Sequence, residues 1–244
     1  MGLYEYWDAL SAECDDFHAY AHDRLGEYKA RTEKDVCIRK MSTYGRWLSI
    51  ASPSILTKHI IRNFKTGRPI KSVKPGQLHQ IVLYDSEGSP LAIEHYSTLS
   101  PDGGLTKRSE TTYFTDYGGC VWTAMFYERS GWIQDEHFKI VYDDMQRLKG
   151  FYQINAHDSQ QVYAEEYDHS RADEGIIVCL FTDYTGHAVH TSKDIPIGFK
   201  GSPAIQWRYE MNVDGKGKIT ALTTYKNTEG EFVFNEHVDF KITG

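Results

Sequence analysis

The chain repeats one short turn between strand-like runs: an aromatic or β-branched residue, then Asp, Glu or Asn, then Gly. Asp and Asn side chains accept hydrogen bonds from the backbone two residues on, and Gly adopts the positive φ angles that close a hairpin. The turn occurs at residues 84–88, 114–118, 127–131, 181–186, 213–215 and 225–230. The pattern therefore predicts a series of β-hairpins.

Runs rich in β-branched and aromatic residues lie between these turns, from residue 78 onward. They are residues 80–84, 91–96, 111–114, 121–127, 138–142, 149–154, 161–164, 176–181, 205–209, 219–225 and 231–234. Short connections favour pairing of sequence neighbours, so we expect an antiparallel meander of about ten strands. The fold class predicted is mainly β (α+β), with an N-terminal helical segment packed on a large twisted meander sheet. Closure of that sheet into a barrel is the alternative form.

The N-terminal part has helical rather than strand periodicity. Apolar residues recur every three or four positions over 3–28, which predicts an amphipathic helix. Ser52 and Pro53 are suited to begin a second helix, and Gly67 with Pro69 to end it. The pattern over 36–50 fits either a strand pair or irregular structure. We therefore expect a helical, basic segment at 1–75 and the meander at 76–244.

A shift of 98 to 100 residues aligns several turns with one another. It places Asp85 on Asp183, and the dipeptide at 136–137 on the one at 236–237. This alignment suggests an internal duplication of the meander. A hairpin series rich in Tyr, Asp and Gly also aligns with itself by composition alone.

Charge is distributed unevenly along the chain, whose formal net charge is −7. Residues 36–84 contain nine basic residues and no acidic residue. Residues 76–244 contain 25 acidic and 14 basic residues, a net charge of −11. An acidic sheet region favours cationic partners and disfavours nucleic acid.

The bulk composition predicts a soluble cytoplasmic protein. The four cysteines are far apart, without a CxxC pair, which favours free thiols over a disulfide framework. The first ten residues contain no basic stretch, and no run approaches the roughly 18 apolar residues of a membrane helix.

The aromatic-Asp-x-x-Gly turns between strands resemble the YD-type hairpin repeats of bacterial toxin shells. They also resemble the hairpin series of small toxin-immunity proteins. The resemblance covers residues 78–244, although the spacing of the turns varies and the Gly-Arg that often follows them in toxin repeats is missing. It implies a hairpin-built sheet in an immunity-type binder and assigns no catalytic residue.

Motifs for catalysis or cofactor binding are weak. Cys14, His18 and His22 have helical spacing, but Cys14 belongs to the apolar stripe and no Glu lies between the histidines. The Glu-His dipeptides point their side chains to opposite faces of a strand. No GxSxG elbow or phosphate loop is present. We therefore predict no catalytic residue, no metal site and no cofactor.

The function expected is non-enzymatic protein binding, as an immunity-type inhibitor that uses an acidic, aromatic-rich sheet surface against a basic toxin domain. The proposed contact residues are Tyr117, Glu128, Trp132, Asp143, Asp144, Glu165, Glu166, Asp168 and Tyr184, chosen as turn-proximal aromatic or acidic residues expected to be exposed.

The alternative is a lipocalin-like barrel, or a barrel-type enzyme, that binds a small apolar ligand. Its pocket would contain Trp122, Tyr127, His137, Phe151, His187, Trp207 and Tyr225. An unclosed meander has two edge strands, and the first helix or a homodimer can cover them.

Overall fold

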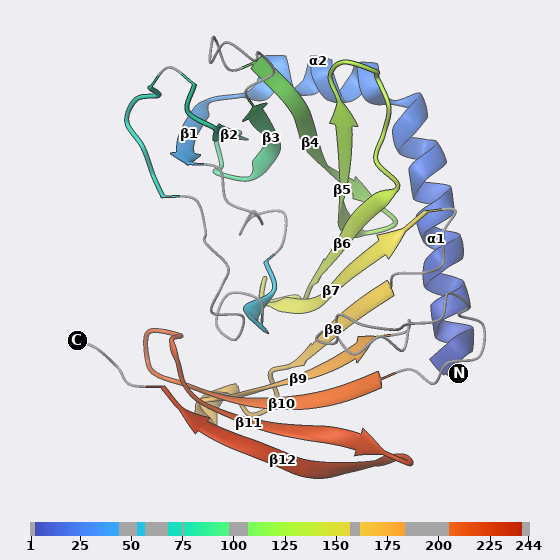
Figure 1. Cartoon of the computed structure of the whole chain (residues 1–244), viewed down its shortest axis with the longest axis vertical. Helices are drawn as coiled ribbons and strands as arrows, with labels where there is room; N and C mark the ends of the chain where they lie inside the picture. Colours follow the sequence, from blue (N-terminus) through green and yellow to red (C-terminus); the bar gives the residue numbers. More distant parts are fainter. Residues whose placement is uncertain are drawn as a thin grey trace. The chain divides into compact units, whose positions relative to one another are not determined.

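The computed structural model describes residues 3–43, 53–56, 68–74, 76–97, 107–156, 162–183 and 205–240 (Figure 1). The chain forms two compact units. We call Ala12–Lys139 the N-terminal unit, and Met1–Ser11 with Ile140–Gly244 the C-terminal unit. The boundary expected at residue 75 lies inside the N-terminal unit, and the internal duplication stays a prediction.

Twelve antiparallel strands follow one another in the order of the sequence, β1 to β12. They are β1 Ile38–Thr43, β2 His79–Tyr84, β3 Pro90–Ser97, β4 Lys107–Tyr117, β5 Cys120–Tyr127, β6 Glu136–Tyr142, β7 Leu148–Asn155, β8 Val162–Asp168, β9 Ile176–Asp183, β10 Ile205–Val213, β11 Ile219–Thr228 and β12 Glu231–Asp239. A 3₁₀ turn, η1 Ala172–Glu174, precedes β9. The predicted meander is confirmed, and its open order begins at β1 and ends at β12.

One strand was not predicted. β1 lies in the region for which the sequence left two possibilities, and it pairs with β2, with Arg39 opposite Leu83. Its exposed basic residues hide the alternation of a strand. Of the second helix predicted after Ser52, only residues 53–56 are described, and Ile55 and Leu56 are helical there. The remainder of that prediction lies outside the described residues.

The N-terminal periodicity produces two helices, α1 Leu3–Asp23 and α2 Leu25–Asp35. The chain leaves helical geometry at Arg24, just before Gly26. The change of direction lets α2 bury Tyr28 and Thr32. The predicted helix is therefore confirmed in type, and it continues beyond residue 28 after this break.

In the N-terminal unit, the helices cover one face of the sheet. Phe17 of α1 is fully buried and stacks on Trp122 of β5 with ring centroids 4.6 Å apart. Tyr28 of α2 stacks on Tyr113 of β4 at 5.7 Å. Large aromatic side chains bury much apolar area per residue, so these two contacts supply a major part of the helix-to-sheet packing.

In the C-terminal unit, the first turns of α1 contact β7 and β8. The hydroxyl of Tyr6 donates to Glu166 Oε1 at 3.1 Å and lies 3.2 Å from the hydroxyl of Tyr152. The ring of Tyr152 lies over Gly150, where a Cβ atom would come within 2.7 Å of it. Glycine at this position therefore allows the tyrosine to reach its partners.

Three hairpin turns share one hydrogen-bond pattern. In each, the Asp Oδ1 atom accepts bonds of 2.8–2.9 Å from the backbone N–H groups two and four residues on. The Asp N–H donates to the carbonyl four residues on, and the residue three positions on donates to the Asp carbonyl. The three turns begin at Asp85, Asp143 and Asp214. The turn-forming role predicted for Asp85 and Asp214 is confirmed, and Asp143 is a further example.

The Asp143 turn escaped the sequence pattern because it lacks glycine. Its fourth position is Gln146, with φ +60°, where the other two turns have Gly88 at +87° and Gly217 at +73°. The left-handed region is costly for residues with a Cβ atom. The hydrogen bonds to Asp143 therefore hold Gln146 in an unfavourable backbone conformation.

Replacing Gln146 by Gly should raise the free energy of unfolding by about 1 kcal/mol, because the left-handed conformation no longer strains a Cβ atom. Gly217→Ala should lower it by a similar amount. A Cβ atom at Gly217 meets nothing within 4 Å, so that variant reports the backbone alone. Urea unfolding of both variants measures the effect, and an unchanged midpoint for Gln146→Gly would contradict it.

Candidate functional site

Two residues proposed for partner contact accept hydrogen bonds from the backbone of their own turns, and their role in partner contact stays a prediction. Backbone N–H groups of Arg147 and Met145 bond to Asp143, and the first of these is the main cause of its lowered pKa. Asp168 accepts in the same way from the backbone N–H of Ser170, which lowers its pKa. Both carboxylates therefore have partners inside the chain.

Three further residues of that set are packed or paired. Tyr117 contacts Phe17, with ring centroids 5.5 Å apart. Glu128 accepts from Arg108 and Thr111. Glu165 was expected on the surface, but it is buried, with 6% exposure, and accepts a hydrogen bond from Tyr167. The expectation of exposure was wrong for Glu165, because it lies inside β8 between the large side chains of Phe151 on β7 and Phe181 on β9.

The remaining contact candidates have different surroundings. Glu166 is half-buried beneath the Tyr6 and Tyr152 hydroxyls. Trp132 is 73% exposed on the turn after β5, and Asp144 is exposed on the turn after β6. Tyr184 lies outside the described residues. The described members of the set divide between the two units, and their joint role in partner contact stays a prediction.

Among the residues of the alternative pocket, two pairs point to opposite faces of the sheet. Trp122 and Tyr127 are five residues apart on β5, so they point to opposite faces of the sheet. Trp207 pairs with Lys226, whereas Tyr225 pairs with Arg208, so Trp207 and Tyr225 also face opposite sides. Neither pair can line a single cavity. Phe151 is buried in β7, and His187 lies outside the described residues.

The histidines of α1 and β6 form a packing contact. His137 is fully buried, and its Nε2 lies 3.0 Å from Nδ1 of His18. His137 Nδ1 lies 3.1 Å from the Thr123 carbonyl, so Nδ1 carries its hydrogen and Nε2 accepts from His18. Within the described part of the chain, no three His, Cys, Asp or Glu side chains are placed to hold a metal ion.

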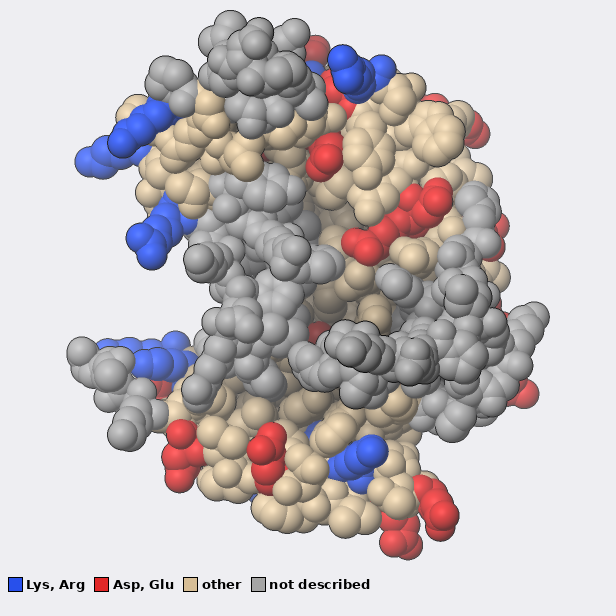
Figure 2. Space-filling model, viewed as in Figure 1, with Lys and Arg blue, Asp and Glu red and all other residues tan. Residues whose placement is uncertain are grey.

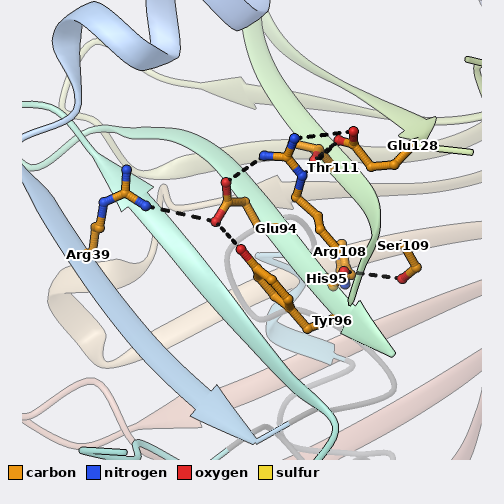
Figure 3. Close-up of polar contacts among 8 residues, drawn as sticks. All are labelled: Arg39, Glu94, His95, Tyr96, Arg108, Ser109, Thr111 and Glu128. Atoms are coloured by element: carbon orange, nitrogen blue, oxygen red, sulfur yellow. Dashed lines mark hydrogen bonds and ion pairs between the residues drawn. The ribbon is translucent and has the colours of Figure 1, made fainter. Parts of the chain in front are cut away.

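A polar cluster that the sequence did not indicate surrounds β3 in the N-terminal unit (Figure 3). Glu94 has a side chain only 9% exposed, and its carboxylate lies 2.9 Å from Arg108 Nη1 and 4.0 Å from Arg39 Nη1. The Tyr96 hydroxyl donates to it at 3.0 Å. Arg108 also bonds to Glu128, with Nε to Oε1 at 3.1 Å. One arginine thus bridges two carboxylates.

The opposite face of the same strands has a second polar row. Gln80, His95 and Glu110 are direct cross-strand neighbours on β2, β3 and β4 and therefore share a face. His95 Nε2 lies 3.3 Å from the Thr112 hydroxyl. Burial lowers the pKa of His95 to about 4 and raises the pKa of Glu110. This row is a buried polar layer in which the histidine is neutral at pH 7.

In the sequence, the segment Glu94-His95-Tyr96 was the feature that could have indicated polar residues on both faces of β3. It follows the apolar run 91–93 inside one strand. A carboxylate inside a strand that is covered on both sides requires a cation or hydrogen-bond donors nearby. Sequence alone does not say that Arg108, fourteen residues on, supplies one of them.

Acidic and basic side chains occur together among the described residues. Figure 2 shows red and blue side chains separated by a mostly uncharged surface on the face drawn. Several carboxylates are paired locally, including Glu94 with Arg108, Glu13 with Lys139 and Asp143 with Arg147. The exposed carboxylates that a partner can contact therefore have to be identified strand by strand.

The last described strand carries such carboxylates, and we call Glu231–Asp239 the β12 edge. Val233 and Phe234 are 54% and 61% exposed. Glu231, Glu236 and Asp239 are also exposed, and the strand contains no Lys, Arg or Pro. Among the described strands, β12 has one neighbour in the strand order, β11 (Figure 1). The sequence signal was three consecutive apolar residues, 232–234, which break the alternation of a one-sided strand.

Removing the Arg108 guanidinium should leave Glu94 poorly paired. Arg108→Met is expected to lower the free energy of unfolding by about 2 kcal/mol, because a largely buried carboxylate loses its main partner. Arg39→Met is the matched control. Arg39 is 58% exposed and 4.0 Å away, so its loss should change stability by less than about 0.5 kcal/mol. Equal effects of the two variants in urea unfolding would contradict this assignment.

Burial of His95 should make stability fall in mild acid. The unfolded chain takes up a proton on this residue near pH 6.5, whereas the folded chain does so only near pH 4. Unfolding free energy therefore decreases as pH falls from 6.5 to 4, by at most about 3 kcal/mol from this residue.

The measurement is urea unfolding of the wild type and His95→Gln across that pH range. The variant should show the shallower decrease. Glu110 contributes with the opposite sign because its pKa is raised, but it is common to both proteins. Identical slopes would show that His95 is not held neutral.

Comparison with known proteins adds little to this description. None of the described helices is long and apolar enough to cross a membrane. No protein-family model matches the chain, and no curated protein matches it. A solved structure of a protein of unknown function from Bacteroides fragilis is similar over 64% of this chain and 86% of that chain, with 8% identity and a TM-score of 0.25. A TM-score this low carries no argument, so function is argued from the residues.

Proposed function

We propose that this chain is a non-enzymatic protein-binding module, most concretely an immunity-type inhibitor of a basic toxin domain. The observation that carries the proposal is the β12 edge, where exposed Val233 and Phe234 lie among exposed carboxylates. Aromatic and aliphatic anchors with acidic surroundings are suited to bind a basic protein surface.

This surface differs from the one expected from the turns. Most acidic residues near the turns are engaged in turn hydrogen bonds or ion pairs, as Asp143 and Glu128 are. Glu231 and Glu236 are exposed on a strand that contains no basic residue. A cationic partner therefore meets negative charge there without an internal competitor on the same strand.

Exposed Trp132 is a second anchor of the kind that interfaces use. Its carbonyl accepts from the Tyr127 N–H at 2.8 Å, and its N–H lies 3.3 Å from Ser130 Oγ. These bonds order the turn backbone before binding, which reduces the entropy lost on association. It lies in the N-terminal unit, so we treat it as a separate contact from the β12 edge.

The test is the association rate of the full chain with the product of the adjacent gene at increasing ionic strength. An acidic surface that attracts a basic partner should give a rate that falls about tenfold or more from low to high salt. Glu231→Gln with Glu236→Gln should reduce the low-salt rate and the salt dependence together. Glu87→Gln, a change at an exposed carboxylate of the turn between β2 and β3, is the control. A rate independent of salt would refute electrostatic recognition, and no association would refute this partner.

A further inference from the structure

The β12 edge has apolar side chains on both of its faces. Val233 and Phe234 are adjacent in a strand, so they point in opposite directions, and both are more than half exposed. A partner that docks on one face of the sheet can cover only one of them. A strand added alongside β12 places side chains next to both.

Some backbone groups of β12 are also directed away from its neighbour in the described part of the sheet. Phe240 donates its N–H to the Thr220 carbonyl. Backbone groups of successive residues in an antiparallel edge strand point alternately toward the neighbour and away from it. His237 and Asp239 therefore direct their N–H and C=O groups away from β11.

Edge strands usually carry features that prevent pairing with another chain, such as Lys, Pro or a bulge. β12 lacks the first two. It has a bulge, where the register with β11 shifts between Thr224 and Tyr225. The bulge separates the apolar half, Glu231 to Phe234, from the half that ends at Asp239, and it leaves both halves extended.

We propose that the β12 edge binds an extended segment of a protein partner as an added strand, and that this segment has apolar side chains next to Lys or Arg. The assumption that the added strand belongs to a partner protein rests on the function proposed above. The charge follows from Glu231, Glu236 and Asp239, which would lie across from the added strand. A second copy of this chain would bring the same acidic residues together, which disfavours it.

The probe is a synthetic peptide of nine alternating Val and Lys residues, the length of β12. Residue-resolved amide exchange of the full chain is measured with and without it. Exchange at His237 and Asp239 should slow about tenfold, because strand addition bonds their outward N–H groups. A peptide with Glu in place of Lys should bind at least about tenfold more weakly.

Variants separate the edge from general stickiness. Val233→Thr with Phe234→Thr keeps β-propensity and should weaken peptide binding about tenfold through lost apolar contact. Met145→Thr is the matched control, because Met145 is 70% exposed in the same unit but lies on the turn after β6. Unchanged exchange in the buried strands confirms that each variant is folded.

Three results would overturn the proposal. In the first, the peptide binds but the amides of His237 and Asp239 are not protected. In the second, the β12 variant binds the peptide as well as the Met145 variant does. In the third, these amides are protected in the chain without peptide, and the protection increases with the concentration of the chain. The last result would assign the edge to a second copy. Peptide protection together with no association to the adjacent-gene product would support strand addition while refuting the proposed function. Salt-dependent association with the adjacent-gene product, without protection of the β12 amides by the peptide, would support the proposed function and refute strand addition.

Discussion

Hydrogen bonding between strands that are neighbours in the sequence is the constraint on which the rest of this structure depends. Each strand from β2 to β11 has a partner on both sides, and the order ends at β1 and β12. A meander with this order must leave backbone groups at its ends, whatever its side chains are. The exposure of Val233 and Phe234 at β12 is significant because it occurs at one of those ends.

The same constraint explains how the charged residues are used. Cross-strand rows bring together side chains that are far apart in sequence, so Glu94 inside the sheet is paired with Arg108 on the neighbouring strand. Arg108 bonds both Glu94 and Glu128, and the Asp turns consume further carboxylates in bonds to their own backbone. The count of acidic residues therefore overstates the number of carboxylates that are available to a partner. The exposed acidic residues that remain for recognition lie in local groups, and β12 carries one such group.

Much of the fold was predictable because its signals are local. The hairpin turns depend on an Asp side chain bonding its own backbone, and the strands and first helix depend on periodicity. β1 was missed because its exposed basic residues lack alternation, and the Asp143 turn was missed because Gln146 replaces the usual glycine. The candidate sites were harder. Glu165 and Asp143 are acidic and close to turns, as expected of contact residues, but Glu165 is buried and the Asp143 carboxylate is engaged in bonds to its own turn.

By itself the sequence determined that this chain is a mainly β meander with an N-terminal helix, since turn chemistry and periodicity act over a few residues. Only the tertiary structure decided which polar residues are available to a partner. That availability depends on cross-strand register, which pairs Glu94 with Arg108 and places Trp122 and Tyr127 on opposite faces. It also depends on position in the strand order, because the same apolar triplet in a central strand would be covered on both sides. At β12 it is exposed, since β12 stands at the end of the strand order among the described residues.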